Sequence, residues 1–508
     1  MQARCAILPV EHHRVDALGW SAQIQAATAR GARLLTLWGK DTRDTSSGGM
    51  SLYACWLEEQ GLSLLQLDLA SGVTHYPGLH AEFPVADRLQ RALRDLLGVQ
   101  AQGMDPRPWL RHTAWGADVY PLRHDAALPP TPCGQPQAEH YAFVLVDGDG
   151  VHEVAVGPVH AGVIEPGQWR FSIVGEKILR LEERFGFTHK GVEKRFEGMT
   201  LHDGVRLAAR LSGDSAVANA WAYCMACETL AGVQPPPRAL HLRALLLERE
   251  RLANHLGDIG AIANDGGFGF ALAQFGRLKE DVLRLNVRAF GARYPMDAVQ
   301  PGGVGLDLDA DAVAMLHNQG VLLGGEVRRL KDILDQHEGL QDRFKTTGRV
   351  LPELAARLGM IGLAGRASGQ ALDLRTAAGF APYAALGVEA AQAQEGDVGA
   401  RVAVRFAEVF TSLRLCGDLL ASLPGGSVRA DWPQTVAPGL ALGLVEGWRG
   451  PQCIVLEADS QGRIARCHPH DPSWQNWPAI EWAVIGDIVP DFPLINKSFN
   501  LSYSGHDL

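Results

Sequence analysis

Short apolar segments separated by polar turns dominate the first 124 residues. Residues 34–38, 50–56 and 62–68 are rich in leucine, tryptophan and tyrosine, and each has the length of a strand. Residues 84–97 then show apolar side chains at helical spacing, with Pro84 just inside the start. The apolar positions are Leu89, Ala92, Leu93, Leu96 and Leu97. Strands followed by a helix predict a small α+β domain over residues 1–124.

A proline-rich segment follows at residues 125–140. It contains Pro129, Pro130, Pro132 and Pro136. Because proline lacks a backbone N–H and disfavours helix at the residue before it, we interpret this segment as a linker between two domains.

The remaining chain, residues 141–508, begins with two strand-like stretches at 141–146 and 169–174. After Gly191 the apolar spacing becomes helical, with helices expected at residues 216–230, 240–262, 310–334, 354–362 and 399–423. Strand-like patterns return between residues 443 and 466. The fold class is therefore α+β, with a large, mainly α-helical second domain that carries peripheral strands.

The helix expected at 240–262 carries a polar stripe as well as an apolar one. The polar stripe comprises Glu248, Arg251, His255 and Asp258, at spacings of 3, 4 and 3 residues. We expect this stripe to face solvent or a partner; the alternative is the wall of a pocket.

Composition narrows the function classes. A formal net charge of -10 in 508 residues argues against a general nucleic-acid binder. The N-terminus lacks the apolar core of a signal peptide, and no stretch of about 18 uninterrupted apolar residues is present. We expect a cytoplasmic protein that lies on the inner face of the membrane through partner subunits.

Several motifs after residue 142 resemble a known family. They are 157–171 (GPVHAGVIEPGQWRF), 189–194 (HKGVEK), 301–304, 365–375, 395–397, 412–415 and 471–479. In this order they resemble the large subunit of membrane-bound, group 4 nickel–iron hydrogenases and the 49-kDa-type quinone-site subunit of respiratory complex I. The N-terminal part is similar to the 30-kDa-type subunit of complex I, on the strength of Phe83-Pro84 before a helix and of 96–98 (LLG).

The resemblance has a direct consequence for metal binding. In the hydrogenases, two Cys-x-x-Cys pairs supply the soft thiolate ligands of the nickel–iron centre. Here the early pair corresponds to Ser212 and Ser215, and the late pair to Ser502 and Gly505. The resemblance therefore implies that no nickel is bound. Maturing hydrogenases also carry a cleavable extension after the late pair, whereas this sequence ends at Leu508.

One Cys-x-x-Cys sequence remains, at Cys224 and Cys227. With no second pair at zinc spacing, we interpret these residues as small core cysteines of a packed helix, and redox or metal use remains the alternative.

The complex I relationship offers a quinone site instead. The quinone-contacting tyrosine of that family would correspond to a position near Gly213, and its second histidine has no clear counterpart. The segment around His160 follows the hydrogenase form. The sequence thus lacks both the metal-binding cysteines of the hydrogenases and the quinone-contacting residues of complex I.

The remaining polar residues form the candidate site. Candidate catalytic residues are Glu193, His189, Asp214 and Arg366, and candidate cofactor-binding residues are His160, Ser212, Ser215 and Asp397; Glu165 and His506 are also titratable. Glu193 matches a glutamate on the family's proton route, and we expect burial beside a histidine to raise its pKa. Asp214 lies between the two lost ligands; its alternative role is to cap the helix that begins near Ser215.

The resemblance implies a subunit of a membrane-associated oxidoreductase complex. An iron–sulfur cluster in a partner small subunit would supply electrons to a quinone or another acceptor, coupled to proton or ion movement by antiporter-like membrane subunits. Two alternatives remain: a catalytically silent structural subunit, and, less favoured, an active nickel–iron hydrogenase or NADH:quinone oxidoreductase subunit.

Overall fold

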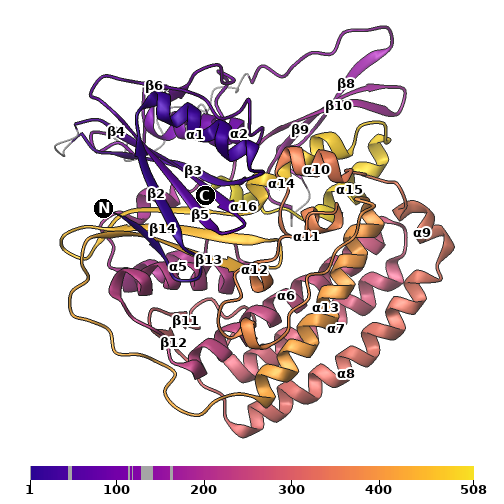
Figure 1. Cartoon of the computed structure of the whole chain (residues 1–508). Coiled ribbons are helices and arrows are strands. Elements are labelled where there is room, and N and C mark those ends of the chain that lie inside the picture. The colour runs from indigo at the N-terminus through magenta and orange to yellow at the C-terminus, as the bar shows by residue number, and fades with distance from the viewer. Residues whose placement is uncertain (1, 44–47, 113–114, 117, 127–140, 161–163) are drawn as a thin grey trace.

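The computed structural model describes residues 2–43, 48–112, 115–116, 118–126, 141–160 and 164–508. Most of the predicted linker, residues 127–140, lies outside the described residues, so the domain boundary there stays a prediction. The fold is α+β, as expected (Figure 1).

The N-terminal part is built around a four-stranded sheet in the order β2-β5-β4-β3. The strands are β2 (Val10–Val15), β3 (Arg33–Asp41), β4 (Met50–Glu58) and β5 (Gly61–Leu69). β2 runs parallel to β5, and the other pairs are antiparallel. The helices are α1 (Ala17–Ala29) and α2 (Ala86–Leu97), and a short parallel pair joins β6 (His75–Tyr76) to β7 (Gln100–Ala101). The predicted strands and helix are confirmed, because their apolar side chains form the buried faces of these elements.

A second sheet lies at the centre of the molecule, in the order β1-β13-β14-β15. Its strands are β1 (Ala3–Cys5), β13 (Gly439–Glu446), β14 (Pro451–Ala458) and β15 (Ile464–His470). β1 pairs in parallel with β13, with Ala3 opposite Leu440. Every residue of β13 is buried. Helix α5 (Ala216–Ala231) packs so closely on it that a Cβ at Gly443 would lie 1.8 Å from the carbonyl oxygen of Ala222.

Long helices form the far side of the molecule from the N-terminal sheet (Figure 1). They are α6 (Pro237–Asp265), α7 (Gly269–Phe290), α8 (Ala310–Asp335) and α13 (Val398–Ala421). α5, α6, α8 and α13 confirm the helices expected at 216–230, 240–262, 310–334 and 399–423, whereas α7 was not predicted and the helix expected at 354–362 ends at Leu358. Two short helices, α3 (Val192–Phe196) and α4 (Leu201–Ala208), precede α5. Short elements between the long helices are β11 (Val299–Gln300), β12 (Gly303–Val304), α9 (Glu338–Phe344), α10 (Pro352–Leu358), α11 (Gly362–Ala367), α12 (Leu374–Ala377) and η1 (Tyr383–Ala385). The C-terminal segment adds α14 (Ser473–Ala483), η2 (Val489–Asp491), α15 (Phe492–Phe499) and α16 (Tyr503–Asp507).

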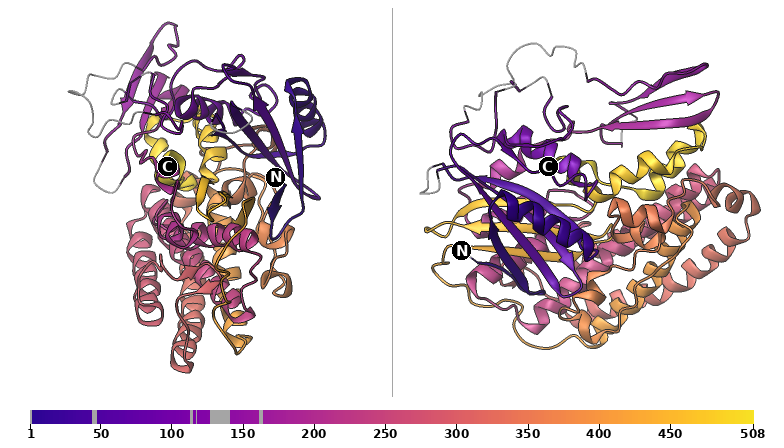
Figure 2. Two further views of the ribbon diagram at one scale, coloured as in Figure 1. Left: turned by 90° about the vertical axis from the view of Figure 1, so that its left-hand side faces the viewer. Right: turned by 45° about the horizontal axis from the view of Figure 1, so that its top comes forward.

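A three-stranded antiparallel sheet projects from the body (Figure 2). It consists of β8 (Val151–Val156), β9 (Gln168–Val174) and β10 (Lys177–Arg184). The strand predicted at 169–174 is confirmed as β9. The strand predicted at 141–146 is wrong: within the described part of the chain this stretch pairs with no strand, and the Val144 amide donates to the Glu182 side chain at 2.8 Å instead.

The polar stripe of α6 is buried, so the expectation that it faces solvent is wrong. Glu248, Arg251 and His255 are completely inaccessible. Their partners come from α13 and nearby segments: Glu408 accepts from Arg251 at 2.9 Å and lies 2.8 Å from the His255 ring nitrogen. Pairing between opposite charges is what permits such groups to be buried.

Among the helices described, none is both long enough and apolar enough to cross a membrane.

Candidate active site

Two segments from opposite ends of the large domain meet near the start of α5. Asn500 adopts a left-handed conformation (φ 46°) that ends α15. The chain then turns so that Ser502 becomes the N-cap of α16, and its hydroxyl accepts a hydrogen bond from the Gly505 amide at 2.9 Å. Across the site, the Ser502 and Ser212 hydroxyl oxygens are 3.0 Å apart. The structure therefore brings Ser212, Ser502 and Gly505 together.

Asp214 forms a bidentate ion pair with Arg449, which lies in the turn between β13 and β14. The guanidinium nitrogens donate to the two carboxylate oxygens at 2.8 and 2.6 Å. Burial acts to raise the pKa of Asp214, but the charge of Arg449 and its hydrogen bonds outweigh burial, and the pKa is lowered. Asp214 is therefore ionised at neutral pH.

Asp214 does not cap α5. The N-cap residue is Ser215, without a side-chain cap bond. The amides of Val217 and Ala218 instead donate to the Glu250 carboxylate at 2.7 and 3.2 Å. The capping hypothesis for Asp214 is wrong, because a carboxylate from α6 already satisfies the exposed amides of the first turn.

The hydrogen-bond partners of the serine hydroxyls determine which hydroxyl donates and which accepts. Ser212 donates its proton to Asp214 Oδ1 at 2.7 Å. Since a hydroxyl has one proton, the bond between Ser212 and Ser502 must then be donated by Ser502. Both hydrogen bonds are therefore donated in the same direction, from Ser502 to Ser212 and from Ser212 to the ionised Asp214.

A cavity of about 460 Å³ lies beside these hydrogen-bonded residues. Asp214, Arg449 and Ser502 are among its polar lining residues, and Trp169, Phe492 and Tyr503 are among its aromatic ones. Its size and mixed lining are those of a small-molecule site.

The predicted residues His160 and Glu165 also line this cavity. His160 donates from Nε2 to the carbonyl of Gly167 at 2.8 Å and packs against the Trp169 ring. Glu165 accepts the hydroxyl and the amide hydrogens of Ser504. Five predicted residues, His160, Glu165, Ser212, Asp214 and Ser502, are thus gathered at or beside one cavity.

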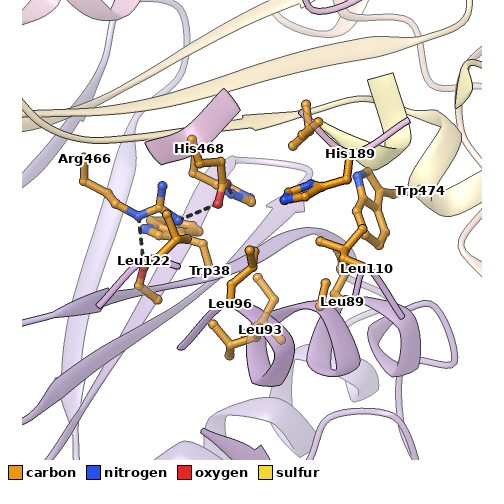
Figure 3. Close-up of a pocket in the computed structure, with 15 residues that line it drawn as sticks. Trp38, Leu89, Leu93, Leu96, Leu110, Leu122, His189, Arg466, His468 and Trp474 are labelled. Atoms are coloured by element: carbon orange, nitrogen blue, oxygen red, sulfur yellow. Dashed lines mark hydrogen bonds and ion pairs between the residues drawn. The ribbon is translucent and has the colours of Figure 1, made fainter. Parts of the chain in front are cut away.

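Glu193 and His189 line a different and much smaller cavity of about 30 Å³, between α2 and β15 (Figure 3). Glu193 is 5% exposed; it accepts a hydrogen bond from Arg466 at 3.0 Å and another from His468. Burial acts to raise the pKa of Glu193, but the charge of Arg466 and the hydrogen bonds from His468 and Arg466 outweigh it and lower the pKa to about 2. The expected rise is therefore wrong, because two basic side chains, invisible in the local sequence, surround the carboxylate.

His189 is held by the C-terminal turn. Its Nδ1 lies 2.8 Å from the Asp507 carbonyl oxygen, to which it must donate. Burial lowers the pKa of the ring, so the neutral imidazole is favoured, with Nε2 as its proton acceptor.

Comparison with known proteins places this geometry in a family. Residues 266–441 match the model of the respiratory-chain NADH dehydrogenase 49-kDa subunit. Formate hydrogenlyase subunit 5 of Escherichia coli (strain K12) is 30% identical over 485 residues, which cover 94% of this chain and 85% of that protein. The chain belongs to this family of hydrogenase and complex I large subunits.

Further relatives support the assignment. The carbon monoxide-induced hydrogenase of Rhodospirillum rubrum is 28% identical over 69% of this chain and 97% of its own length. Among solved structures, a chain of the membrane-bound sulfane sulfur reductase, an archaeal respiratory membrane complex, superposes with a TM-score of 0.67 at 25% identity. That match covers 71% of this chain and 99% of the other.

The donor set does not fit the nickel–iron centre of the hydrogenase members of the family. Serine hydroxyls are too weakly acidic to replace bridging thiolates. A Cβ at Gly505 would lie 2.6 Å from Asp471 Oδ2 and 2.9 Å from the Ser502 hydroxyl, so even the first atom of a cysteine side chain lacks room there. An aspartate carboxylate therefore lies against the position of the fourth ligand.

Four other predicted residues, Arg366, Asp397, Ser215 and His506, form hydrogen bonds or ion pairs within the protein and line neither cavity. Arg366 is fully buried and forms ion pairs with Glu408 and Glu446 at 2.6 and 2.8 Å. Asp397 caps α13 by accepting from the Ala400 amide at 2.8 Å. Neither residue lines the two cavities described above.

Ser215 and His506 are buried near the site without lining its cavity. Ser215 accepts from Arg449 at 3.4 Å, and His506 bonds to Asp507 at 2.9 Å and stacks on Trp474.

Cys224 and Cys227 are free thiols inside α5, both completely buried. Burial raises the pKa of each well above its ordinary value, which keeps them as neutral thiols. Their packing agrees with the interpretation as core residues.

Sequence reasoning missed Arg449, Asp471, Arg466 and His468. Each lies in or next to an apolar strand of the central sheet, where a charged side chain requires a buried partner. A charged or polar residue within or next to an apolar strand could therefore have indicated a buried polar site, although its partners lie far away in the sequence.

Proposed function

We propose that this chain is the large subunit of a membrane-associated oxidoreductase complex of the hydrogenase and complex I type, and that it works without a nickel–iron centre. The observation that carries the proposal is the converted metal site. Three hydroxyls and a glycine stand at the positions that correspond to thiolates, and an Asp214–Arg449 ion pair and Asp471 lie next to them. The cavity of about 460 Å³ beside this cluster provides room for an organic acceptor.

We further propose that a small partner subunit carrying an iron–sulfur cluster delivers electrons to a quinone or another acceptor in this cavity, coupled to proton or ion movement by antiporter-like membrane subunits. The relatives support this proposal, since formate hydrogenlyase and the sulfane sulfur reductase are multi-subunit enzymes by name or title. Neutral aromatic walls beside an arginine suit a planar molecule with carbonyl oxygens. Glu193 and His189 would pass protons on as members of a relay.

Metal analysis tests the first part. The complex is purified from its native membrane, and nickel, iron and subunits are quantified together. The proposal expects iron from the partner and no stoichiometric nickel. One nickel per large subunit would overturn it.

Two conservative variants test the second part. Asp214→Asn and Glu193→Gln each remove a charge while keeping the side-chain shape. In an assembled complex, both should lower quinone-dependent turnover by about 10²-fold, the usual contribution of a positioned acid–base group. Asp311→Asn, an exposed acid in the first turn of α8, is the matched control and should retain full turnover.

A catalytically silent coupling subunit is the second candidate function. It is favoured by the closed hydrogen-bonding of the serine cluster, in which the protons of Ser212 and Ser502 are directed at neighbouring protein oxygens. Full turnover in both variants, with normal assembly, would support this candidate over the first.

A further inference from the structure

The N-terminal sheet reaches directly into the surroundings of Glu193. Thr36, in β3, is completely buried, and its hydroxyl oxygen lies 2.8 Å from His468 Nε2. On the other side of the same ring, His468 Nδ1 bonds to Glu193. Arg466 makes a parallel link, donating from Nε to the carbonyl of Gly39 in β3 and from Nη2 to Glu193, both at 3.0 Å. Two side chains of β15 thus connect the carboxylate to the N-terminal sheet.

The hydrogen-bond partners determine where the hydrogens lie between Glu193, His468 and Thr36. Glu193 is ionised and can only accept, so His468 Nδ1 must carry a hydrogen and donate it. In the neutral ring Nε2 is then an acceptor, and the Thr36 hydroxyl donates to it. If the ring gains a second proton, the same hydroxyl accepts from Nε2–H. Threonine supports His468 in both states, which valine cannot do.

The order carboxylate, imidazole, hydroxyl is also that of a hydrolase triad, but this site cannot be one. The Thr36 hydroxyl is inaccessible, and the adjacent cavity of about 30 Å³ has room for a single water. No substrate carbonyl could approach. The arrangement is suited to fixing a ring and a carboxylate, with one water space beside them.

We propose that Thr36 is a positioning residue for proton transfer at Glu193, supplied by the N-terminal sheet; this rests on the proposed function. Glu193 fixes the Nδ1–H tautomer of His468, and Thr36 fixes the orientation of the ring through Nε2; His468 with Arg466 then fixes the carboxylate at the cavity wall. One proton passes between His189 Nε2 and a Glu193 oxygen through a water in the cavity. At rest the imidazole is neutral and the carboxylate is ionised, so the protonated carboxylic acid is a transient state, and no electron moves in this step.

The tautomer of His468 is measured in the full chain by nitrogen NMR with labelled histidine, independently of activity. His468→Gln identifies the signal by its loss. The proposal expects the Nδ1–H tautomer in the wild type, in Thr36→Ser and in Thr36→Val, and a shifted Nε2 resonance in Thr36→Val alone, because that variant loses the hydrogen bond to the unprotonated nitrogen. A wild-type ring protonated only at Nε2, or a Thr36→Val spectrum identical to the wild type, would overturn it.

Turnover of the assembled complex provides the second measurement. Thr36→Val should lower turnover about tenfold, less than complete removal of an acid–base group. Thr36→Ser should restore it, and Thr28→Val, on the exposed side of α1, is the matched control. Loss in Glu193→Gln with no loss in Thr36→Val would overturn this inference while leaving the proposed function intact. Full turnover in Glu193→Gln would overturn the proton-transfer role of Glu193 itself.

Discussion

Replacing Gly505 with alanine tests whether the fourth ligand position can accept a side chain at all. The new Cβ would meet Asp471 Oδ2 at 2.6 Å. That carboxylate cannot easily retreat, because it is 3% exposed and is held by the Ser473 amide at 2.8 Å and the Gln452 side chain at 2.9 Å. Overpacking of this kind destabilises by about 3 kcal/mol at its upper end. Alanine regains about 1 kcal/mol of helix propensity within α16, which leaves a net loss of about 2 kcal/mol.

Gly213→Ala is the matched control, a second glycine of the same site. Its added Cβ would find only Met296 Cε, at 3.8 Å. This variant should therefore be neutral or stabilised by up to about 1 kcal/mol. Equilibrium urea unfolding, followed by tryptophan fluorescence, should separate the two variants by about 2–3 kcal/mol. Trp477 reports locally, because its indole nitrogen donates to the Ser502 carbonyl at 3.2 Å.

Equal stability of the Gly505→Ala and Gly213→Ala variants would refute the steric reasoning. The double variant Gly505→Ala with Asp471→Ala supplies an internal test. Removing the opposing carboxylate should make the alanine at position 505 less destabilising than it is alone, because the two positions are in contact.

Three further outcomes follow from buried charges and thiols. The folded-state pKa of Glu193 is about 2, below its ordinary 4.5, so its stabilising contribution is complete above pH 4.5 and is lost as the pH falls toward 2; Glu193→Gln should flatten unfolding free energy against pH in that window. Arg366→Met leaves two buried carboxylates without their main partner and should destabilise by about 3–5 kcal/mol, whereas Arg414→Met, which breaks an exposed pair, should change stability by less than about 1 kcal/mol in the same denaturation assay. Cys224 and Cys227 should resist an aromatic disulfide reagent in the native protein and react on unfolding; rapid native labelling of either would contradict their placement in the core.

The elements that the sequence predicted well are those in which the buried face is defined locally. The strands at 34–38, 50–56 and 62–68 became β3, β4 and β5, in which most side chains on both faces are buried, so a local run of apolar residues was sufficient to predict them. The stretch at 141–146 is also apolar, but within the described residues it has no neighbouring strand, and its Val144 amide bonds to a side chain. Composition reports the preference for burial, whereas strand formation also requires a partner.

The candidate site was predictable only in part, for a related reason. The family motifs predict Ser212 and Ser502 at ligand positions of one site, the first in the early pair and the second in the late pair, and these hydroxyls do meet. The charge state of Asp214 depends on Arg449, which lies 235 residues further along the chain. Likewise the spacing on α6 correctly placed Glu248 and His255 on one face but could not reveal the opposing charges of α13.

The pairing of Ala3 with Leu440 constrains the order in which this protein can be assembled during synthesis. Ala3 leaves the ribosome 437 residues before Leu440, its partner in the central sheet. The N-terminal sheet can form early from its own strands, but β1 must stay unpaired until β13 emerges. Completion of the central sheet is therefore a late step in folding, because the hydrogen bonds of β1 depend on residues that are synthesised long after it.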